Sequence, residues 1–516
     1  ILPFLFLAIC WSLPLLSYWL IEIDYPIFFF QKISPDEFMY WQQIDALHLI
    51  LQKMDIQKLI FFEDKFGYGA LFWQFFALVS YPFRHWSESN DGSFIFVLRL
   101  INLSFQLLTG FVLLEIHRKI YPKLFSLWSF VLFIAFMPGL FFMWKAYSPD
   151  YLSAFSFVLC IYLITCFIQN ECKCQRYLYS GLFFLGLSFS LKLYNAFFLI
   201  GLTPILLIGM FKGKIKFHEK RLIQIFSCLF FLMAGLIIGN LRLLSTPYEY
   251  LGLLKLHSSF VNSHEYVHSM PNSVSHIHRF FNWFNNSYSK TYIGLSSRGI
   301  LSEFFGYPAI ILGLLATYFA IIQNKINGFF PTPRGFSPLL LYVSSLMMLS
   351  IILLTNRVWT WYLLTPVLLL ALSINIVLWQ SIEKQNNLSF LKKIISLLFI
   401  LHVLSSVNNL YAKFIEKKEG SLLAFEQLNS EFLSCVEPYI IKSKSYLNKH
   451  IYVPYGFPVK VEANITVYSD NGVLPDVFSS ADYIFLRKKH EDSLTGFSSE
   501  FKITQCHEDV YFLERT

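Results

Sequence analysis

Long apolar stretches recur from one end of the chain to the other, and each is close to the length of a membrane crossing. A transmembrane helix needs about 20 predominantly apolar residues. Such stretches lie near residues 1–21, 93–114, 124–144, 151–169, 177–191, 193–211, 222–241, 305–323, 337–355, 359–380 and 394–411. We therefore expect an all-α polytopic membrane domain of about eleven transmembrane helices. Lys192 alone separates the fifth stretch from the sixth.

Two segments between these stretches are too long to be simple connections. Residues 22–92 place apolar and polar side chains with helical spacing, for example Phe38 and Trp41 beside Gln42. That spacing predicts amphipathic helices that lie along the membrane surface. Residues 242–304 are rich in Asn, Ser and His and have little periodicity.

The composition changes beyond residue 412, where Lys, Glu, Asn and Ser become frequent. Short alternating runs predict strands near residues 451–454, 463–468, 483–486 and 510–513. We expect a transmembrane domain over residues 1–412 and a small soluble α/β domain over residues 413–516. Cys435 and Cys506 both fall in the second domain, and the sequence leaves open whether they pair.

The charges fit a membrane protein better than a nucleic-acid-binding protein. Only 14% of the 516 residues are charged, against about 25% in soluble domains. The net charge of +8 comes from Lys and Arg in alternate short loops: Arg118, Lys119 and Lys123; Lys173 and Arg176; Lys212, Lys214, Lys216, Lys220 and Arg221; Lys325 and Arg334; Lys384, Lys392 and Lys393. Positive loops of this kind face the cytoplasm. Residues 22–92, 242–304 and 413–516 are therefore expected on the other side, with membrane lipids rather than nucleic acid as partners.

The tripeptide Ser-Pro-Asp occurs twice, at residues 34–36 and 148–150, and both copies fall on the expected outer side. Each predicts a helix start, with Ser at the N-cap and Pro in the first turn. Capping alone explains Asp36 and Asp150, and it explains Glu37 as part of a capping box. The alternative is catalytic, because a carboxylate that is ionised at a helix N-terminus can act as a base or bind a metal.

Basic residues near the same side are candidates for binding an anion. Arg357 is the lone basic residue of a short outer loop and precedes an aromatic cluster. It suits either a bidentate phosphate contact or an interfacial anchor. Lys65 and Glu63 lie in the same turn. On one interpretation Lys65 holds a phosphate and Glu63 helps to hold a cation, and on the other the turn is a solvated charge cluster. Arg99, at the start of the second stretch, either snorkels outward or serves an anionic site.

The order of these motifs resembles that of the GT-C glycosyltransferases, in particular the dolichyl-phosphate-mannose–protein mannosyltransferase-like group. That group includes bacterial enzymes that modify lipid A with aminoarabinose. An acidic pair follows the first span, a turn with Lys65 ends the first outer loop, and Arg99-Leu100-Ile101 opens the next helix. The second Ser-Pro-Asp follows the third span, and Arg-x-x-x-x-Tyr-Leu-Leu-x-Pro at residues 357–366 precedes the final helices. The resemblance covers residues 1–411.

The resemblance implies a glycosyltransferase that takes a sugar from a polyprenyl-phosphate donor, with inversion. The acceptor is a glycan, a lipid or a protein on the outer face of a bacterial inner membrane or the lumenal face of the endoplasmic reticulum. Asp36 is then the catalytic base, Glu37 its neighbour and Asp150 part of the site. The resemblance also allows a divalent cation held by Asp150 and Glu63. The cations Lys65, Arg99 and Arg357 then bind the donor phosphate.

The chain departs from this group in two places. Many relatives have Lys-Pro-Pro where this chain has Lys65-Phe66-Gly67, and the lipid A enzymes have an Arg near the position of Met39. The second departure argues against aminoarabinose as the sugar. Two other classes stay open: a transporter of lipid-linked sugars, and an outer-face polysaccharide polymerase or ligase.

Overall fold

A computed structural model describes residues 1–21, 23, 35–62, 69–86, 92–137, 140, 147–170, 174–201, 221–248, 252, 306–323, 338–354, 363–384, 390–408, 450–454, 464–468, 481–487, 500–507 and 510–516. The chain forms two compact units, which we describe separately. Residues 1–19, 43–82 and 97–413 form the first unit, and residues 20–42, 83–96 and 414–516 form the second.

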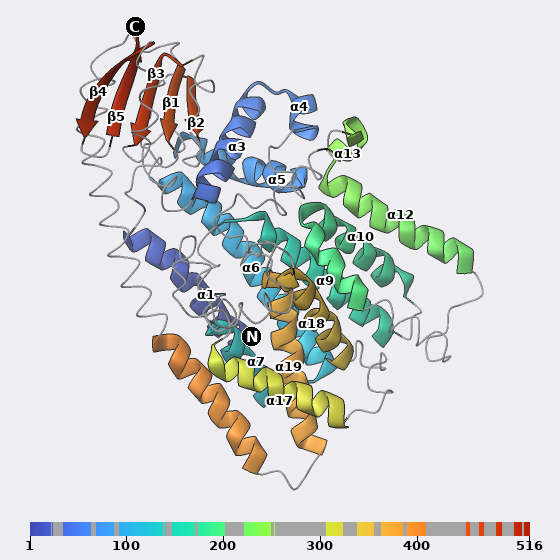
Figure 1. The fold of residues 1–516 in the computed structure, drawn as a ribbon. Helices are drawn as coiled ribbons and strands as arrows, with labels where there is room; N and C mark the ends of the chain where they lie inside the picture. The colour runs from blue at the N-terminus through green and yellow to red at the C-terminus, as the bar shows by residue number, and fades with distance from the viewer. Residues whose placement is uncertain are drawn as a thin grey trace. The chain divides into compact units, whose positions relative to one another are not determined.

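The predicted transmembrane stretches are helical wherever they are described (Figure 1). The helices are α1 (Leu2–Ile21), α6 (Ser93–Ile120), α7 (Leu124–Ala135), α9 (Pro149–Gln169), α10 (Gln175–Leu191), α12 (Arg221–Gly239), α17 (Tyr307–Gln323), α18 (Pro338–Leu354), α19 (Leu364–Lys384) and an unlabelled helix, Phe390–Asn408. Of the sixth predicted stretch, residues 193–201 are described, beginning with the 3₁₀ turn η3 (Leu193–Ala196). Within the described residues, five helices have the length and apolarity of a membrane span. The protein is a multi-pass membrane protein.

The first long loop contains helices, as its amphipathic spacing predicts. They are α3 (Pro35–Gln52), α4 (Ile56–Ile60), α5 (Ala70–Ser80) and η2 (Tyr81–Trp86). Gln74 Nε2 donates a hydrogen bond of 2.8 Å to Leu59 O, and His48 Nε2 lies 3.1 Å from both Ala77 O and Ser80 Oγ. These buried contacts join α3, α4 and α5 within the first unit. The second long loop begins with α13 (Arg242–Ser245), and its residues 253–305 lie outside the described part.

Glycines allow α10 and α12 to pack closely, and Figure 1 shows the two helices side by side. A Cβ atom on Gly186 would overlap Leu232 O, and one on Gly235 would overlap Phe183 O. A Cβ atom on Gly239 would overlap Ser190 Oγ. Small residues at four-residue spacing bring helix backbones together in this way in membranes. The other side of α10 packs against α9.

Polar pairs join the helix ends that the charge pattern assigns to the cytoplasm. Lys119 Nζ donates to Gln169 Oε1 at 3.2 Å, which connects α6 to α9. Lys123 forms an ion pair of 3.5 Å with Glu383 of α19. The ends that the positive-inside rule predicts on one side therefore lie together in the structure.

A buried polar cluster connects α6, α7 and α19 near the same ends. The side-chain amide of Asn375 hydrogen-bonds Ser126 and Ser129, and it lies 3.2 Å from His117 Nε2. Trp379 Nε1 donates to Ser129 Oγ at 2.7 Å. All five side chains come from helices that are otherwise apolar, so the cluster fixes how the three helices are rotated against one another.

The C-terminal part of the second unit contains a five-stranded mixed sheet in the order β2-β1-β3-β5-β4 (Figure 1). Its strands are β1 (His450–Pro454), β2 (Asn464–Tyr468), β3 (Tyr483–Arg487), β4 (Phe501–His507) and β5 (Val510–Arg515). β1 runs parallel to β2 and β3, whereas β5 runs antiparallel to β3 and β4. Four strands match the predicted runs to within two residues, and β4 is an addition.

Both faces of this sheet are apolar around β3 and β5. Ile484 and Leu513 are paired in register and belong to a buried cluster on one face. On the other face the rings of Tyr483 and Phe512 stack at 5.7 Å. Cys506 is in a disulfide, whereas Cys435 lies outside the described residues. The bond fits an oxidising compartment for this domain.

Candidate functional site

The second Ser-Pro-Asp motif begins α9, as its sequence predicts. Ser148 has extended backbone angles and is the N-cap, and its Oγ accepts a hydrogen bond of 3.3 Å from the Asp150 backbone N–H. Pro149 lies in the first turn, where its missing N–H costs nothing. All three residues are buried. Capping therefore fixes the position of the Asp150 carboxylate at the start of a membrane helix.

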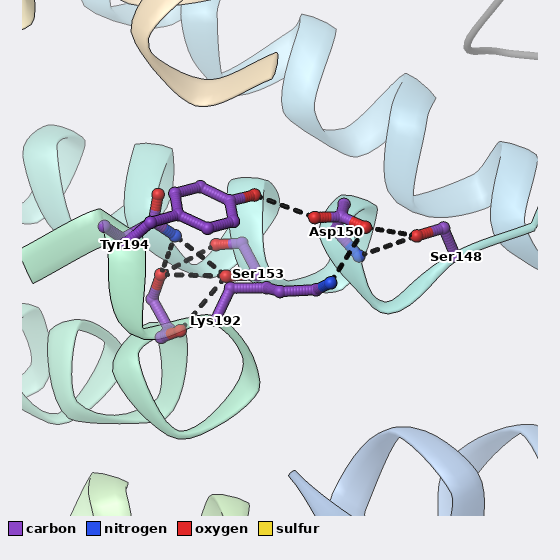
Figure 2. Close-up of polar contacts among 7 residues, drawn as sticks. Ser148, Asp150, Ser153, Lys192 and Tyr194 are labelled. Carbon is purple, nitrogen blue, oxygen red and sulfur yellow. Dashed lines mark hydrogen bonds and ion pairs between the residues drawn. The ribbon is translucent and has the colours of Figure 1, made fainter. Parts of the chain in front are cut away.

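The Asp150 carboxylate binds two residues that follow the end of α10 (Figure 2). Tyr194 Oη donates to Asp150 Oδ1 at 2.8 Å, and Lys192 Nζ forms an ion pair of 3.3 Å with Oδ2. The Ser148 hydroxyl donates to the same Oδ2. Asp150 is 1% exposed and Lys192 is 7% exposed, so the two charges neutralise each other out of water.

This arrangement defines what the Asp150 carboxylate can do. A buried charge is costly unless it is paired and hydrogen-bonded, and Asp150 meets both conditions through its two oxygen atoms. With Tyr194 on one oxygen and Lys192 and Ser148 on the other, the carboxylate orients an ammonium and a phenol. The geometry suits Asp150 to organise a site rather than to remove a proton from a substrate.

The same arrangement does not fit Asp150 as a metal ligand. A divalent cation on Oδ2 would have to displace the Lys192 ammonium, which already neutralises the carboxylate. Among the described residues, no group of three or more His, Cys, Asp and Glu side chains could hold a metal ion. Glu63, the other predicted ligand, lies outside the described part. We therefore assign no step to a metal, and a metal requirement stays a prediction.

Helix α5 of the first long loop packs against the Asp150 end of the bundle. The ring of Phe76 stacks on Tyr147, the residue before Ser148, at 6.1 Å. At the N-cap of α5, a Cβ atom on Gly69 would lie 2.6 Å from Gly239 O and 3.1 Å from Ser190 O. The turn before α5, the end of α10 and the end of α12 therefore meet.

Basic residues lie close in sequence to the three contacting positions Gly69, Ser190 and Gly239. Lys192 follows Ser190 by two residues, and Lys65 precedes Gly69 by four. Arg242 follows Gly239 by three residues; it is mostly buried, and its Nε donates to Thr246 Oγ1 at 3.2 Å. Lys65 itself lies outside the described residues.

Arg99, the predicted cation of α6, is buried rather than snorkelling into solvent. It is 3% exposed, and its guanidinium lies 4.0 Å from the centre of the Tyr18 ring of α1. A cation this close to an aromatic ring makes a cation–π contact, which helps to offset the cost of burying the charge of Arg99 in a membrane helix.

The remaining predicted residues are described only in part. Glu37 lies in α3 and is 1% exposed. Asp36 also lies in α3, but its side chain is outside the described part, as is the whole of Arg357. Where the side chains of Asp36, Lys65 and Arg357 lie relative to Asp150 is therefore outside the described part, and their roles stay predictions.

Sequence reasoning missed Lys192 and Tyr194 as partners of Asp150. One signal was present, because Lys192 is a lone charge between two apolar stretches and such charges are costly unless they are paired. The pairing itself was not readable, since Asp150 and Lys192 come from different helices.

Comparison with known proteins gives a fold for the whole chain. Neither a protein-family model nor a curated protein sequence matches it. A crystal structure of ArnT from Cupriavidus metallidurans bound to undecaprenyl phosphate matches with a TM-score of 0.55 and 11% identity, over 99% of this chain and 97% of that chain. The apo structure of the same ArnT matches with a TM-score of 0.54 and 10% identity, over 98% of this chain and 95% of that chain.

The chain has the fold of ArnT. The match is therefore to a helical bundle followed by a small C-terminal domain, which is the fold class that the sequence predicts. Because it spans nearly both chains, it includes the helical bundle as well as the C-terminal part. At this level of identity the likeness to ArnT establishes the fold and leaves the activity to be argued from the residues.

Proposed function

We propose that this protein is a membrane glycosyltransferase that moves a sugar from a polyprenyl-phosphate donor to an acceptor on the extracytoplasmic or lumenal face. The observation that carries the proposal is the whole-chain likeness to an ArnT bound to undecaprenyl phosphate. Support comes from the buried Asp150–Lys192 pair at one end of the bundle, where the ends of α10 and α12 meet Gly69 at the start of α5. A membrane bundle of this kind offers an apolar surface to a polyprenyl tail and cations to its phosphate.

The proposed reaction is an inverting displacement at the anomeric carbon. The acceptor hydroxyl oxygen attacks that carbon, and its proton passes to the Asp36 carboxylate. The bond between the anomeric carbon and the phosphate oxygen breaks, and polyprenyl phosphate leaves with the electron pair. The charge that develops on the leaving phosphate requires preorganised cations.

The proposed cations are Lys65, Arg99, Arg357 and Lys192. Lys192 is added because the structure holds its ammonium at a fixed place, on Asp150 and beside the Tyr194 hydroxyl. Asp150 is accordingly the organiser of the site and Asp36 its base. The aspartates of the two Ser-Pro-Asp motifs therefore have different chemical roles.

A transfer assay in nanodiscs tests the proposal. Wild type, Asp36→Asn and Lys192→Met are offered a panel of polyprenyl-phosphate sugars, with and without a chelator, and free polyprenyl phosphate is measured. We expect release by wild type, and a loss of about 10²- to 10⁴-fold in Asp36→Asn because a general base contributes that much. Asp55→Asn, which retains the N-cap of α4, is the matched control.

Each result has a distinct meaning. Full activity of Asp36→Asn would remove the proposed base, and loss of activity with the chelator would require a metal. No release from folded protein with any donor would overturn the proposal in favour of a lipid-linked sugar transporter or a polymerase.

A further inference from the structure

Three polar side chains lie directly beside the Asp150–Lys192 pair, and all three are fully buried. Ser153 is on α9, three residues after Asp150. Ser188 is in the last turn of α10, and Asn195 is in η3. Figure 2 labels Ser153 next to Lys192.

The two serines join α9 to α10 through reciprocal hydrogen bonds. Ser153 Oγ donates to Ser188 O at 3.0 Å, and Ser188 Oγ donates to Ser153 O at 3.0 Å. Asn195 Nδ2 then donates to both hydroxyls, at 2.8 Å to Ser153 and 2.7 Å to Ser188. One amide group therefore holds two helices together.

The network is bonded to the backbone that carries the partners of Asp150. Ser188 O accepts from Ser153 and also from the Lys192 backbone N–H at 2.9 Å. The Asn195 backbone N–H donates to Lys192 O at 3.3 Å, and Asn195 follows Tyr194 directly. The segment with Lys192 and Tyr194 is thus anchored at both ends, at Ser188 and at Asn195.

We propose that Ser153, Ser188 and Asn195 are positioning residues that set Lys192 and Tyr194 on the Asp150 carboxylate. The inference rests on the proposed transferase activity for its kinetic consequences. None of the three residues binds Asp150 itself, so each acts through the placement of the Lys192–Tyr194 segment.

The same helix offers a matched control. Ser156 lies three residues beyond Ser153 and is equally buried, but its hydroxyl donates to Leu152 O of its own helix at 2.8 Å. Ser156→Ala removes the same atom from the same helix without touching α10. A role in packing alone predicts similar effects for Ser153→Ala and Ser156→Ala, whereas a positioning role predicts different ones.

The first test is kinetic. We expect Ser153→Ala and Asn195→Ala to lower kcat by about 10- to 100-fold, because small misplacements of a site cost that much. The KM for the donor should change by less than about twofold if only transition-state contacts are disturbed. In a Tyr194→Phe/Lys192→Met background, Asn195→Ala should cost at most about twofold, since residues that act through one another are not additive.

The second test needs no transfer activity. The rate of Lys192 acylation by a water-soluble amine reagent is measured by mass spectrometry in wild type, Asn195→Ala, Ser153→Ala and Ser156→Ala. We expect modification to be about tenfold faster in Asn195→Ala and Ser153→Ala than in wild type, because Lys192 is then less firmly held on Asp150. We expect no change in Ser156→Ala. Equal rates in all four proteins would overturn the proposal.

The two failures are distinguishable. If Lys192→Met and Tyr194→Phe are fully active while Asn195→Ala still accelerates Lys192 labelling, the placement stands and its catalytic role is wrong. If Ser153→Ala and Ser156→Ala lose kcat equally, or if the loss in Asn195→Ala persists in the double background, the network is packing and the inference is wrong.

Discussion

Removing the Lys192 ammonium alone should destabilise the protein much more than removing it together with the charge of its partner, the Asp150 carboxylate. In Lys192→Met the Asp150 carboxylate stays buried with only the Ser148 and Tyr194 hydroxyls. Breaking a buried ion pair by removing one partner costs about 3–5 kcal/mol. In Lys192→Met/Asp150→Asn both charges are gone, and replacing a buried pair by neutral groups is often close to neutral. The double variant should therefore recover most of the loss.

The assay is unfolding in detergent or nanodiscs, followed by tryptophan fluorescence. Lys123→Met is the matched control, because Lys123 pairs with Glu383 at 3.5 Å while both side chains are about half exposed. Exposed pairs of that kind are worth about 0–1 kcal/mol. We expect the order wild type, Lys123→Met, double variant and Lys192→Met, from most to least stable. The reasoning is refuted if Lys192→Met is as stable as Lys123→Met, or if the double variant is no more stable than Lys192→Met.

Three further outcomes are expected. Gly69→Ala should lower both stability and activity, because the new Cβ would lie 2.6 Å from Gly239 O, whereas a Cβ on Gly252 meets no atom of the described residues within 4 Å, so Gly252→Ala should leave melting unchanged. The Lys58 backbone N–H and ammonium hold the pKa of Asp55 below its usual value. The cap therefore stabilises α4 above about pH 4, and this stabilisation is lost as the pH falls. The amide exchange rate of α4, corrected for intrinsic rates, should rise in acid for wild type and not for Asp55→Asn. Cys506 should react with an alkylating reagent only after reduction, and a non-reducing peptide map will show whether its partner is Cys435, a pairing that the sequence leaves open.

The helices and the Ser-Pro-Asp helix start were predictable because their causes are local. Twenty apolar residues favour a membrane span wherever they occur, and Ser148 caps the helix that begins immediately after it. The strands near β1, β2, β3 and β5 alternate in the same readable way. In each case the relevant neighbours are within a few residues along the chain.

What the sequence did not predict depends on contacts between distant segments. Asp150 pairs with Lys192, which lies at the end of α10, so a search for acidic motifs along the chain does not identify this partner. Strand β4 was missed because exposed Gln505 ends the apolar face of Phe501 and Ile503 after two positions, and the strand is paired with one neighbour, β5. The close approach of Gly69 to Gly239 is likewise a property of three packed segments and not of any one of them.

The pairing of Asp150 with Lys192 also has a consequence for how the protein is made. Lys192 is synthesised 42 residues after Asp150, which at about 5–20 residues per second is a delay of about 2–8 seconds. During that interval α9 exists without its counter-charge, so the carboxylate must remain hydrated at the membrane boundary. Only when the end of α10 emerges can both charges leave water together. We therefore expect α9 and α10 to enter the bilayer as one hairpin, with the ion pair closing behind them.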